Sequence, residues 1–303
     1  AAGALIAAGA DVHARSGGGF TPLLFAAREG SLAALDVLLA AGARRPLDAG
    51  AEANDTAPDG ASALVVAAHS GHRELVLTLL DRGANPNASG AGYTALHAAV
   101  LTGDIEVVEA LLAAGASANA QVTLATKVTR NGQVLMLGEH LLGATPLALA
   151  AKFTDVDVME ALAKAGADVR LPLKNGGTPL MLAAGAGWRY AVWDRRERTL
   201  HKTPAFQAQM YDEAGTRETV RFLLDRGAYV NAVDADGNTA LHYVVDKGFD
   251  GVVELLVEHG ADLDIANRRG QTPYAIVARG RTGNIAAAPA TVRLLESLGS
   301  VRR

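Results

Sequence analysis

A Thr-Pro-Leu-like tripeptide recurs seven times along this chain of 303 residues, and a Gly-Ala pair usually follows it at a fixed distance. The tripeptides begin at Thr21, Ser62, Thr94, Thr145, Thr178, Thr239 and Thr272, and the Gly-Ala pairs begin at Gly9, Gly42, Gly83, Gly115, Gly166, Gly227 and Gly260. In five repeats the first residue of the tripeptide precedes the glycine by 21 positions, and the whole pattern has a period of about 33 residues. A period of this length indicates stacked structural units that bury one continuous core.

Three intervals are too long for this period, and they locate insertions at about 44–58, 121–142 and 187–217. The second insertion places β-favouring residues on both sides of Asn131-Gly132, a pattern typical of a β-hairpin, although a loop without regular structure is the alternative. The third insertion lies between the two expected helices of one repeat and contains both tryptophans of the chain.

Within a repeat the sequence predicts a turn, two helices and a loop. Thr94 is a suitable N-cap, Gly103 interrupts the first helix, and apolar residues from Val107 to Leu112 follow at helical spacing. Gly115 then stands where a left-handed C-cap is expected. The predicted fold class is therefore an all-α solenoid of about seven full helix–turn–helix repeats, preceded by half a repeat.

Composition excludes several classes of function. Aromatic residues make up only 5% of the chain against 50% hydrophobic residues, which suits thin layers of closely packed helices. The net charge of −4 argues against a nucleic-acid partner, and no apolar run approaches the roughly 20 residues of a membrane span. Without cysteine there is neither a disulfide nor thiolate chemistry. The oligomeric state is left open.

No set of residues has the spacing of a catalytic or metal site. His97 and His242 occupy equivalent positions of the repeat, and His69 with His72 lacks a third metal ligand. The chain has no Gly-rich phosphate loop and no nucleophile elbow. We therefore expect no catalytic residue, no metal and no cofactor.

The segment from Asp236 to His242, closed by Gly260-Ala261-Asp262, resembles an ankyrin repeat, and so does the segment from Gly71 to Asn87. The resemblance covers nearly the whole chain. It implies antiparallel helix pairs, β-hairpin-like fingers, a concave surface that binds another macromolecule, and a structural hydrogen bond from each of the two equivalent histidines. We expect one solenoid over residues 1–303.

The Ala-rich style is similar to environmental bacterial ankyrin proteins, many of which are exported, so an exported bacterial protein, periplasmic or extracellular, is favoured over a cytoplasmic one. Counting back from Gly9 places the start of the chain inside the second helix of a repeat, so further residues are expected to precede it. At the other end, residues 291–298 are expected to form a last helix with a polar outer face.

The ankyrin register assigns candidate partner-binding residues to the concave side and the fingers: Phe20, Phe25, Arg28, Tyr93, Leu101, Lys152, Phe153, Tyr243 and Lys247. The third insertion adds residue types that are enriched at interface hot spots: Trp188, Tyr190, Trp193, Arg195 and Arg196. The alternative for the insertion is that its tryptophans pack against the split repeat while its arginines are solvated.

We therefore predict a non-catalytic protein–protein interaction scaffold with a protein or peptide partner. One alternative is an accessory domain of a larger exported bacterial protein whose activity lies outside this chain. Another is a small-molecule-binding or enzymatic protein that uses the third insertion.

Overall fold

The computed structural model describes residues 2–42, 53–130, 133–186, 212–278 and 288–299. These residues divide into two compact units. Unit 1 comprises Ala1–Glu139 with Lys164–Gly166, and unit 2 comprises His140–Ala163 with Ala167–Arg303.

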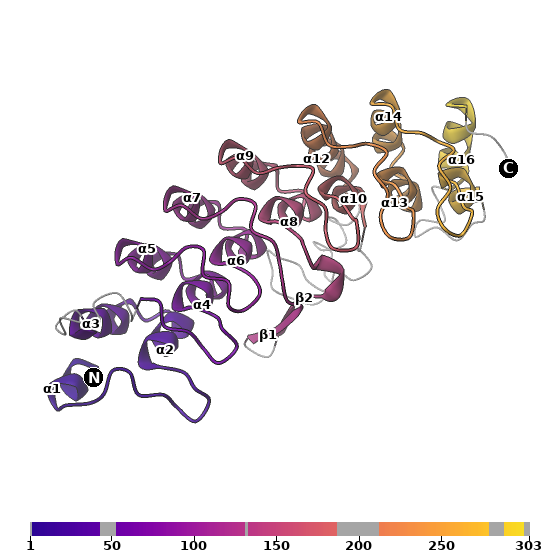
Figure 1. Ribbon diagram of the computed structural model, residues 1–303. Helices are drawn as coiled ribbons and strands as arrows, with labels where there is room; N and C mark the ends of the chain where they lie inside the picture. The colour runs from indigo at the N-terminus through magenta and orange to yellow at the C-terminus, as the bar shows by residue number, and fades with distance from the viewer. Residues whose placement is uncertain (1, 43–52, 131–132, 187–211, 279–287, 300–303) are drawn as a thin grey trace. The chain divides into compact units, whose positions relative to one another are not determined.

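Unit 1 contains two rows of helices (Figure 1). The first row is α2 (Pro22–Glu29), α4 (Ala63–Ser70) and α6 (Ala95–Thr102), and the second row is α3 (Leu32–Gly42), α5 (Arg73–Asp81) and α7 (Ile105–Ala113). Each first-row helix packs on the second-row helix that follows it in sequence, and α1 (Ala2–Ala7) packs on α3. Each first-row helix thus begins just after the Thr or Ser of its tripeptide, and each second-row helix ends at or just before the Gly-Ala pair.

Unit 2 has the same two-row organisation (Figure 1). The first row is α8 (Pro146–Lys152), α10 (Pro179–Ala184), α13 (Ala240–Lys247) and α15 (Pro273–Ala278). The second row is α9 (Val156–Lys164), α12 (Glu213–Asp225), α14 (Asp250–Glu258) and α16 (Ala288–Ser297). Helix α16 closely matches the last helix expected at 291–298.

The helices begin where the recurring Thr or Ser predicts. The Thr21 Oγ1 accepts a hydrogen bond from the Leu24 amide at 3.4 Å, and the Ser62 Oγ accepts one from the Val65 amide at 3.2 Å. These bonds satisfy an amide that has no partner inside the helix. At the far end Gly103 takes φ 72°, a left-handed conformation that glycine adopts without the strain of a side chain.

Leucine and alanine fill the space between the rows. Leu24, Leu64 and Leu96 are fully buried in unit 1, and Leu147 and Leu180 are fully buried in unit 2. Burying one such side chain contributes about 1.5–3 kcal/mol of transfer free energy. Alanines beside them let the helix backbones approach closely, as the aromatic-poor composition predicts.

Short hydrogen bonds connect the loops that end successive repeats. The Asn87 Nδ2 donates to the carbonyl of Gly115 at 2.8 Å, and Asn231 makes the same bond in a later repeat. In the repeat before that of Asn231, Arg170 stands at the equivalent position in place of asparagine, and its Nε donates to the carbonyl of Gly227 at 3.0 Å. The chain therefore ties neighbouring repeats through one fixed register position.

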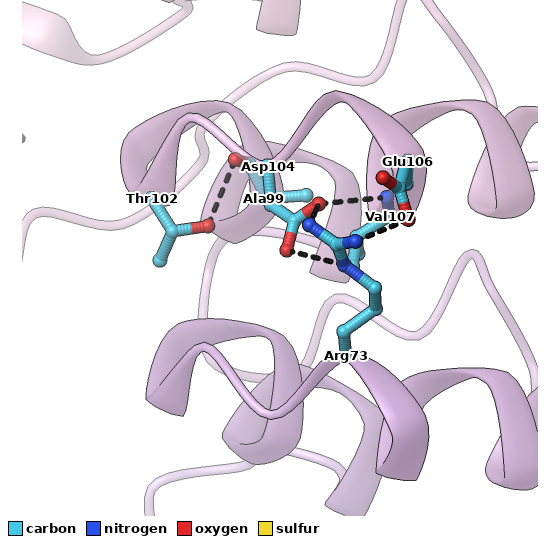
Figure 2. A network of polar contacts seen from close by, with 6 residues as sticks. All are labelled: Arg73, Ala99, Thr102, Asp104, Glu106 and Val107. Carbon is cyan, nitrogen blue, oxygen red and sulfur yellow. Dashed lines mark hydrogen bonds and ion pairs between the residues drawn. The ribbon is translucent and has the colours of Figure 1, made fainter.

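An ion-pair network connects α5 and α7 in the second row of unit 1 (Figure 2). The Arg73 Nε donates to the Asp104 Oδ2 at 3.0 Å, and the same guanidinium pairs with Glu106. Asp104 also caps α7, because its Oδ1 accepts from the Val107 amide at 3.3 Å. The hydrogen bond to Asp104 raises the pKa of Arg73. The Asp104 carboxylate thus caps α7 and also binds Arg73 of the preceding repeat.

The hairpin predicted in the second insertion is present. Strand β1 (Thr126–Arg130) pairs antiparallel with β2 (Gln133–Leu137), with Arg130 opposite Gln133, while residues 131–132 lie outside the described residues. Just before it, the Thr123 amide donates to the carbonyl of Gly92 at 2.8 Å, which joins the segment to the preceding finger.

The other two insertions are described only in part. Residues 44–52 of the first and 187–211 of the third lie outside the described residues. Helix α12 already begins at Glu213, so its first turn occupies the end of the predicted third insertion. The Asp212 Oδ1 caps that helix by accepting from the Gly215 amide at 2.9 Å.

Candidate binding surface

Three of the predicted binding residues form one cluster at helix α2 of unit 1. The ring centroids of Phe20 and Phe25 are 5.5 Å apart, and the guanidinium carbon of Arg28 lies 5.6 Å and 5.0 Å from them, respectively. Phe25 is 37% exposed, and the Arg28 side chain is 47% exposed while its Nε pairs with Glu29 at 2.9 Å. We call Phe20, Phe25 and Arg28 the aromatic–arginine cluster.

The next repeat holds the backbone beneath this cluster. The His72 Nε2 donates to the carbonyl of Arg28 at 3.0 Å. Gly30 ends α2 with φ 78°, and a Cβ there would stand 2.6 Å from the His72 ring. The imidazole therefore fits against α2 because the capping residue is glycine.

Two other unit 1 candidates are less available than expected. Tyr93 is only 2% exposed, and its ring centroid lies 6.2 Å from that of His69. Burial, followed by the charge of Asp59, raises the pKa of Tyr93. Its expected place on the binding surface is therefore corrected, because this ring packs inside the repeat stack. Leu101 is half-buried near the end of α6.

In unit 2 the structure brings together two lysines that the sequence assigned separately. Helix α10 packs between α8, which ends with Lys152, and α13, which ends with Lys247. Lys247 is 8% exposed and Lys152 is half-buried. Burial lowers the pKa of each lysine to about 8, and the charge of Lys247 further lowers that of Lys152.

The two aromatic candidates of unit 2 are half-buried. Phe153 follows Lys152 at the end of α8. The Tyr243 hydroxyl donates to the Asp234 carboxylate in the finger before α13. Burial first, and then Asp234, raises the pKa of Tyr243. The remaining candidates, Trp188, Tyr190, Trp193, Arg195 and Arg196, lie outside the described residues.

The recurring histidines have structural roles, as predicted. The His242 Nδ1 accepts from the amide of Thr239 at 3.1 Å, and its Nε2 donates to the carbonyl of Gln271, in the next repeat, at 3.0 Å. His97 makes the equivalent bond to Thr94 at 3.2 Å. Burial lowers the pKa of His242, so the imidazole is held in its neutral form.

Among the described residues no group of three or more His, Cys, Asp or Glu side chains is arranged to hold a metal ion. No helix in the described part of the chain is long and apolar enough to cross a membrane.

Sequence reasoning missed one feature of unit 2, the glycine between the two lysines. Lys152 stands seven positions after Thr145 and Lys247 eight positions after Thr239, while Gly185 stands seven positions after Thr178. A comparison of the first-row helices position by position aligns Gly185 with Lys152 only, because Lys247 stands one position later in its repeat.

The helix pairs in two rows identify the class of protein as a helical repeat protein. A family model described as "Ankyrin repeats (3 copies)" matches residues 43–122 and 196–289, more than half of the chain. The chain therefore belongs to the ankyrin repeat family, whose members are generally protein-interaction modules and typically non-enzymatic.

Relatives and solved structures agree with this assignment. The chain is 33% identical over 150 residues to NF-kappa-B inhibitor alpha of Gallus gallus, covering 46% of this chain and 47% of that protein. It is 28% identical over 224 residues to Ankyrin repeat and SOCS box protein 16 of Homo sapiens, covering 69% of this chain and 46% of that protein. The chain thus spans less than half the length of these curated relatives.

The crystal structure of the human ASB11 ankyrin repeat domain matches with a TM-score of 0.62 and 24% identity, covering 94% of this chain and all of that one. This likeness shows the fold alone.

Proposed function

We propose that this chain is a non-catalytic scaffold that binds a protein or peptide partner, in part through the aromatic–arginine cluster of unit 1. The observation that carries the proposal is the exposure of Phe25 beside Arg28 in a chain with few aromatic residues. Aromatic and arginine side chains are the types that dominate interface energetics. The ankyrin family supplies the wider expectation that the ligand is a protein.

The cluster is suited to this role because it is held in place before a partner arrives. The two phenylalanine rings pack against each other, the guanidinium lies over both, and His72 anchors the backbone below. Side chains ordered in advance lose less conformational entropy on binding. An apolar or aromatic residue of a partner can cover the rings while a carboxylate pairs with Arg28.

Peptide display against the purified chain tests the proposal. Selected peptides are titrated against the wild type, Phe25→Ala and Arg28→Ala, with Leu77→Ala as the matched control, because Leu77 is 40% exposed but lies on α5 in the second row. Loss of a hot-spot residue corresponds to about 2 kcal/mol, or about a 30-fold weaker Kd. The control is expected to bind as the wild type does.

Two results would count against the proposal in different ways. Equal binding by the wild type and both cluster variants would remove the cluster from the interface. Failure to select any peptide, together with failure to capture any protein from the native source, would contradict the scaffold function itself.

A further inference from the structure

Tyr229 departs from the repeat pattern in the loop that follows α12. In four other repeats, the residue two positions after the glycine of the Gly-Ala pair has a side-chain oxygen that accepts a hydrogen bond from the main-chain amide two positions later. Tyrosine cannot make this turn bond, and Tyr229 is 64% exposed. An exposed aromatic ring therefore stands where those four repeats have a short polar side chain. The four residues that make the turn bond are Asp11, Asn85, Asp168 and Asp262.

Arg170 departs from the pattern in the preceding repeat, four positions after its glycine. Three other repeats have asparagine there, and its side chain donates to the glycine carbonyl of the next repeat. The Arg170 Nε makes the equivalent bond to Gly227 at 3.0 Å, which leaves the N–H groups of Nη1 and Nη2 for other partners. Arg170 is exposed, and among the described residues no acidic side chain pairs with its guanidinium.

Arg170 and Tyr229 lie against each other in unit 2. The guanidinium carbon of Arg170 lies 5.4 Å from the centroid of the Tyr229 ring. Gly227 leaves room for this approach, since a Cβ there would stand 2.8 Å from the Arg170 Nη2. The bond to Gly227 and the contact with the ring hold the guanidinium in place before any ligand binds. We call Arg170 and Tyr229 the arginine–tyrosine pair.

The stacking of repeats requires neither residue of the pair. Asparagine makes the bond to the glycine carbonyl in three other repeats, and aspartate or asparagine makes the turn bond in four. An exposed contact between a guanidinium and an aromatic ring contributes only about 0.5–1 kcal/mol, which is similar to one such hydrogen bond. A binding role accounts better for the pair, because tyrosine and arginine are enriched at interface hot spots.

We propose that the arginine–tyrosine pair is a second binding site, which takes an acidic segment of a protein partner. A carboxylate of the segment accepts parallel hydrogen bonds from the Arg170 guanidinium, whose planar fork matches its shape. The carbon chain of the segment covers the exposed ring of Tyr229. The choice of a protein segment rests on the proposed function. The net charge of the chain is −4 and repels acidic peptides in general, so such a ligand is held by the local site.

The test uses a capped, fluorescently labelled octapeptide, Gly-Ser-Glu-Leu-Glu-Leu-Gly-Ser, which is titrated into the full chain by fluorescence anisotropy at low ionic strength. The control peptide has glutamine in place of each glutamate. The acidic peptide is expected to bind, and the control peptide is expected to bind about ten-fold more weakly or not at all, because it cannot form charge-assisted bonds with the guanidinium.

Two variants restore residue types found in other repeats and so separate binding from stability. Arg170→Asn keeps a donor for the Gly227 carbonyl, and Tyr229→Asn regains an acceptor for the turn. Both should melt near the wild-type temperature and weaken binding of the acidic peptide by about ten-fold. Arg170→Lys keeps the charge without the planar fork, and it should also weaken binding several-fold. Arg221→Gln removes an exposed charge from α12, and its Kd should stay within about two-fold of the wild type.

Circular dichroism shows whether each variant is folded, and Arg170→Lys provides a further reading if Arg170→Asn is not. Unchanged binding by folded Arg170→Asn and Tyr229→Asn would overturn the site, and so would absence of binding by the acidic peptide. Equal weakening by Arg170→Asn and Arg221→Gln would show general electrostatic attraction in place of a site. Wild-type binding by Arg170→Lys would contradict recognition through the planar fork. A peptide with phosphoserine in place of glutamate that binds more than about ten-fold more tightly would overturn the assignment to a carboxylate.

This experiment is independent of the test of the scaffold function. If display yields no peptide, the octapeptide titration still reads the arginine–tyrosine pair. If a selected partner binds but the acidic octapeptide does not, the scaffold function stands and the second site alone is wrong.

Discussion

Replacing Lys247 by methionine should stabilise the free protein at neutral pH. The change keeps an unbranched side chain over Phe249 and beside Gly185, and it removes a buried charge. Burial lowers the pKa of Lys247 from its ordinary 10.5 to about 8. At 1.36 kcal/mol per pKa unit, this shift corresponds to about 3 kcal/mol at most, and we expect a gain of about 1–3 kcal/mol.

The sign of the pH dependence follows from proton binding in the two states. Below pH 8 both the folded and the unfolded wild type carry the proton, so the folded state bears the full penalty of burying it. Between pH 8 and 10.5 the folded state has released the proton while the unfolded state keeps it, so the free energy of unfolding of the wild type rises. The advantage of Lys247→Met should therefore shrink across this interval.

Urea denaturation of both proteins at pH 7, 9 and 10.5 measures this difference. Lys174→Met is the control, since an exposed lysine has no burial penalty to relieve. A variant that is less stable than the wild type at pH 7, by an amount that does not vary with pH, would refute the reasoning. It would show that Lys247 contributes attractive contacts that outweigh the cost of burial.

Three further outcomes are expected. Asp104→Ala should lower the free energy of unfolding by about 1 kcal/mol through loss of the cap on the Val107 amide, whereas Asp104→Asn should retain most of that stability, as urea denaturation would show. Burial lowers the pKa of His242 in the folded state, so stability should fall as the pH drops through 6.5, and His242→Gln should flatten that slope in thermal melts between pH 7 and 5; an unchanged slope in the variant would show that another group carries the pH dependence. Replacing residues 187–211 by a short Gly-Ser linker, which spares the cap of α12, should preserve helicity by circular dichroism and weaken capture of a selected partner; undiminished capture would remove this segment from the interface.

The helix pairs were predictable because their signals are local. Thr21 and Ser62 form caps that depend on residues three positions away, and Gly103 ends a helix through its own backbone conformation. The hairpin at 121–142 was predictable for the same reason, since strand-favouring residues flank a turn sequence.

The surface was harder to predict because exposure depends on the neighbouring repeat. Tyr93 stands just before its Thr, as Phe20 does, yet Tyr93 is buried beside His69 and Phe20 joins the exposed cluster. Lys247 is buried because Gly185, more than sixty positions earlier, leaves room for it. Neither the burial of Tyr93 nor that of Lys247 can be predicted from the position of the residue within its own repeat.

The helix dipole ordinarily explains a lysine at the end of a helix, but it does not explain why the two lysines of unit 2 are buried. Lys152 and Lys247 lie in the last turns of α8 and α13, as Arg28 does in α2, and a cation there interacts favourably with the helix dipole. That interaction is typically worth about 0.3–1 kcal/mol and would raise the pKa of a lysine. The pKa of each lysine is instead lowered to about 8, so burial outweighs the dipole for both, and the charge of Lys247 adds to the effect on Lys152. An exposed lysine one turn away would gain the interaction with the dipole without this cost, so the helix dipole alone does not account for the buried placement.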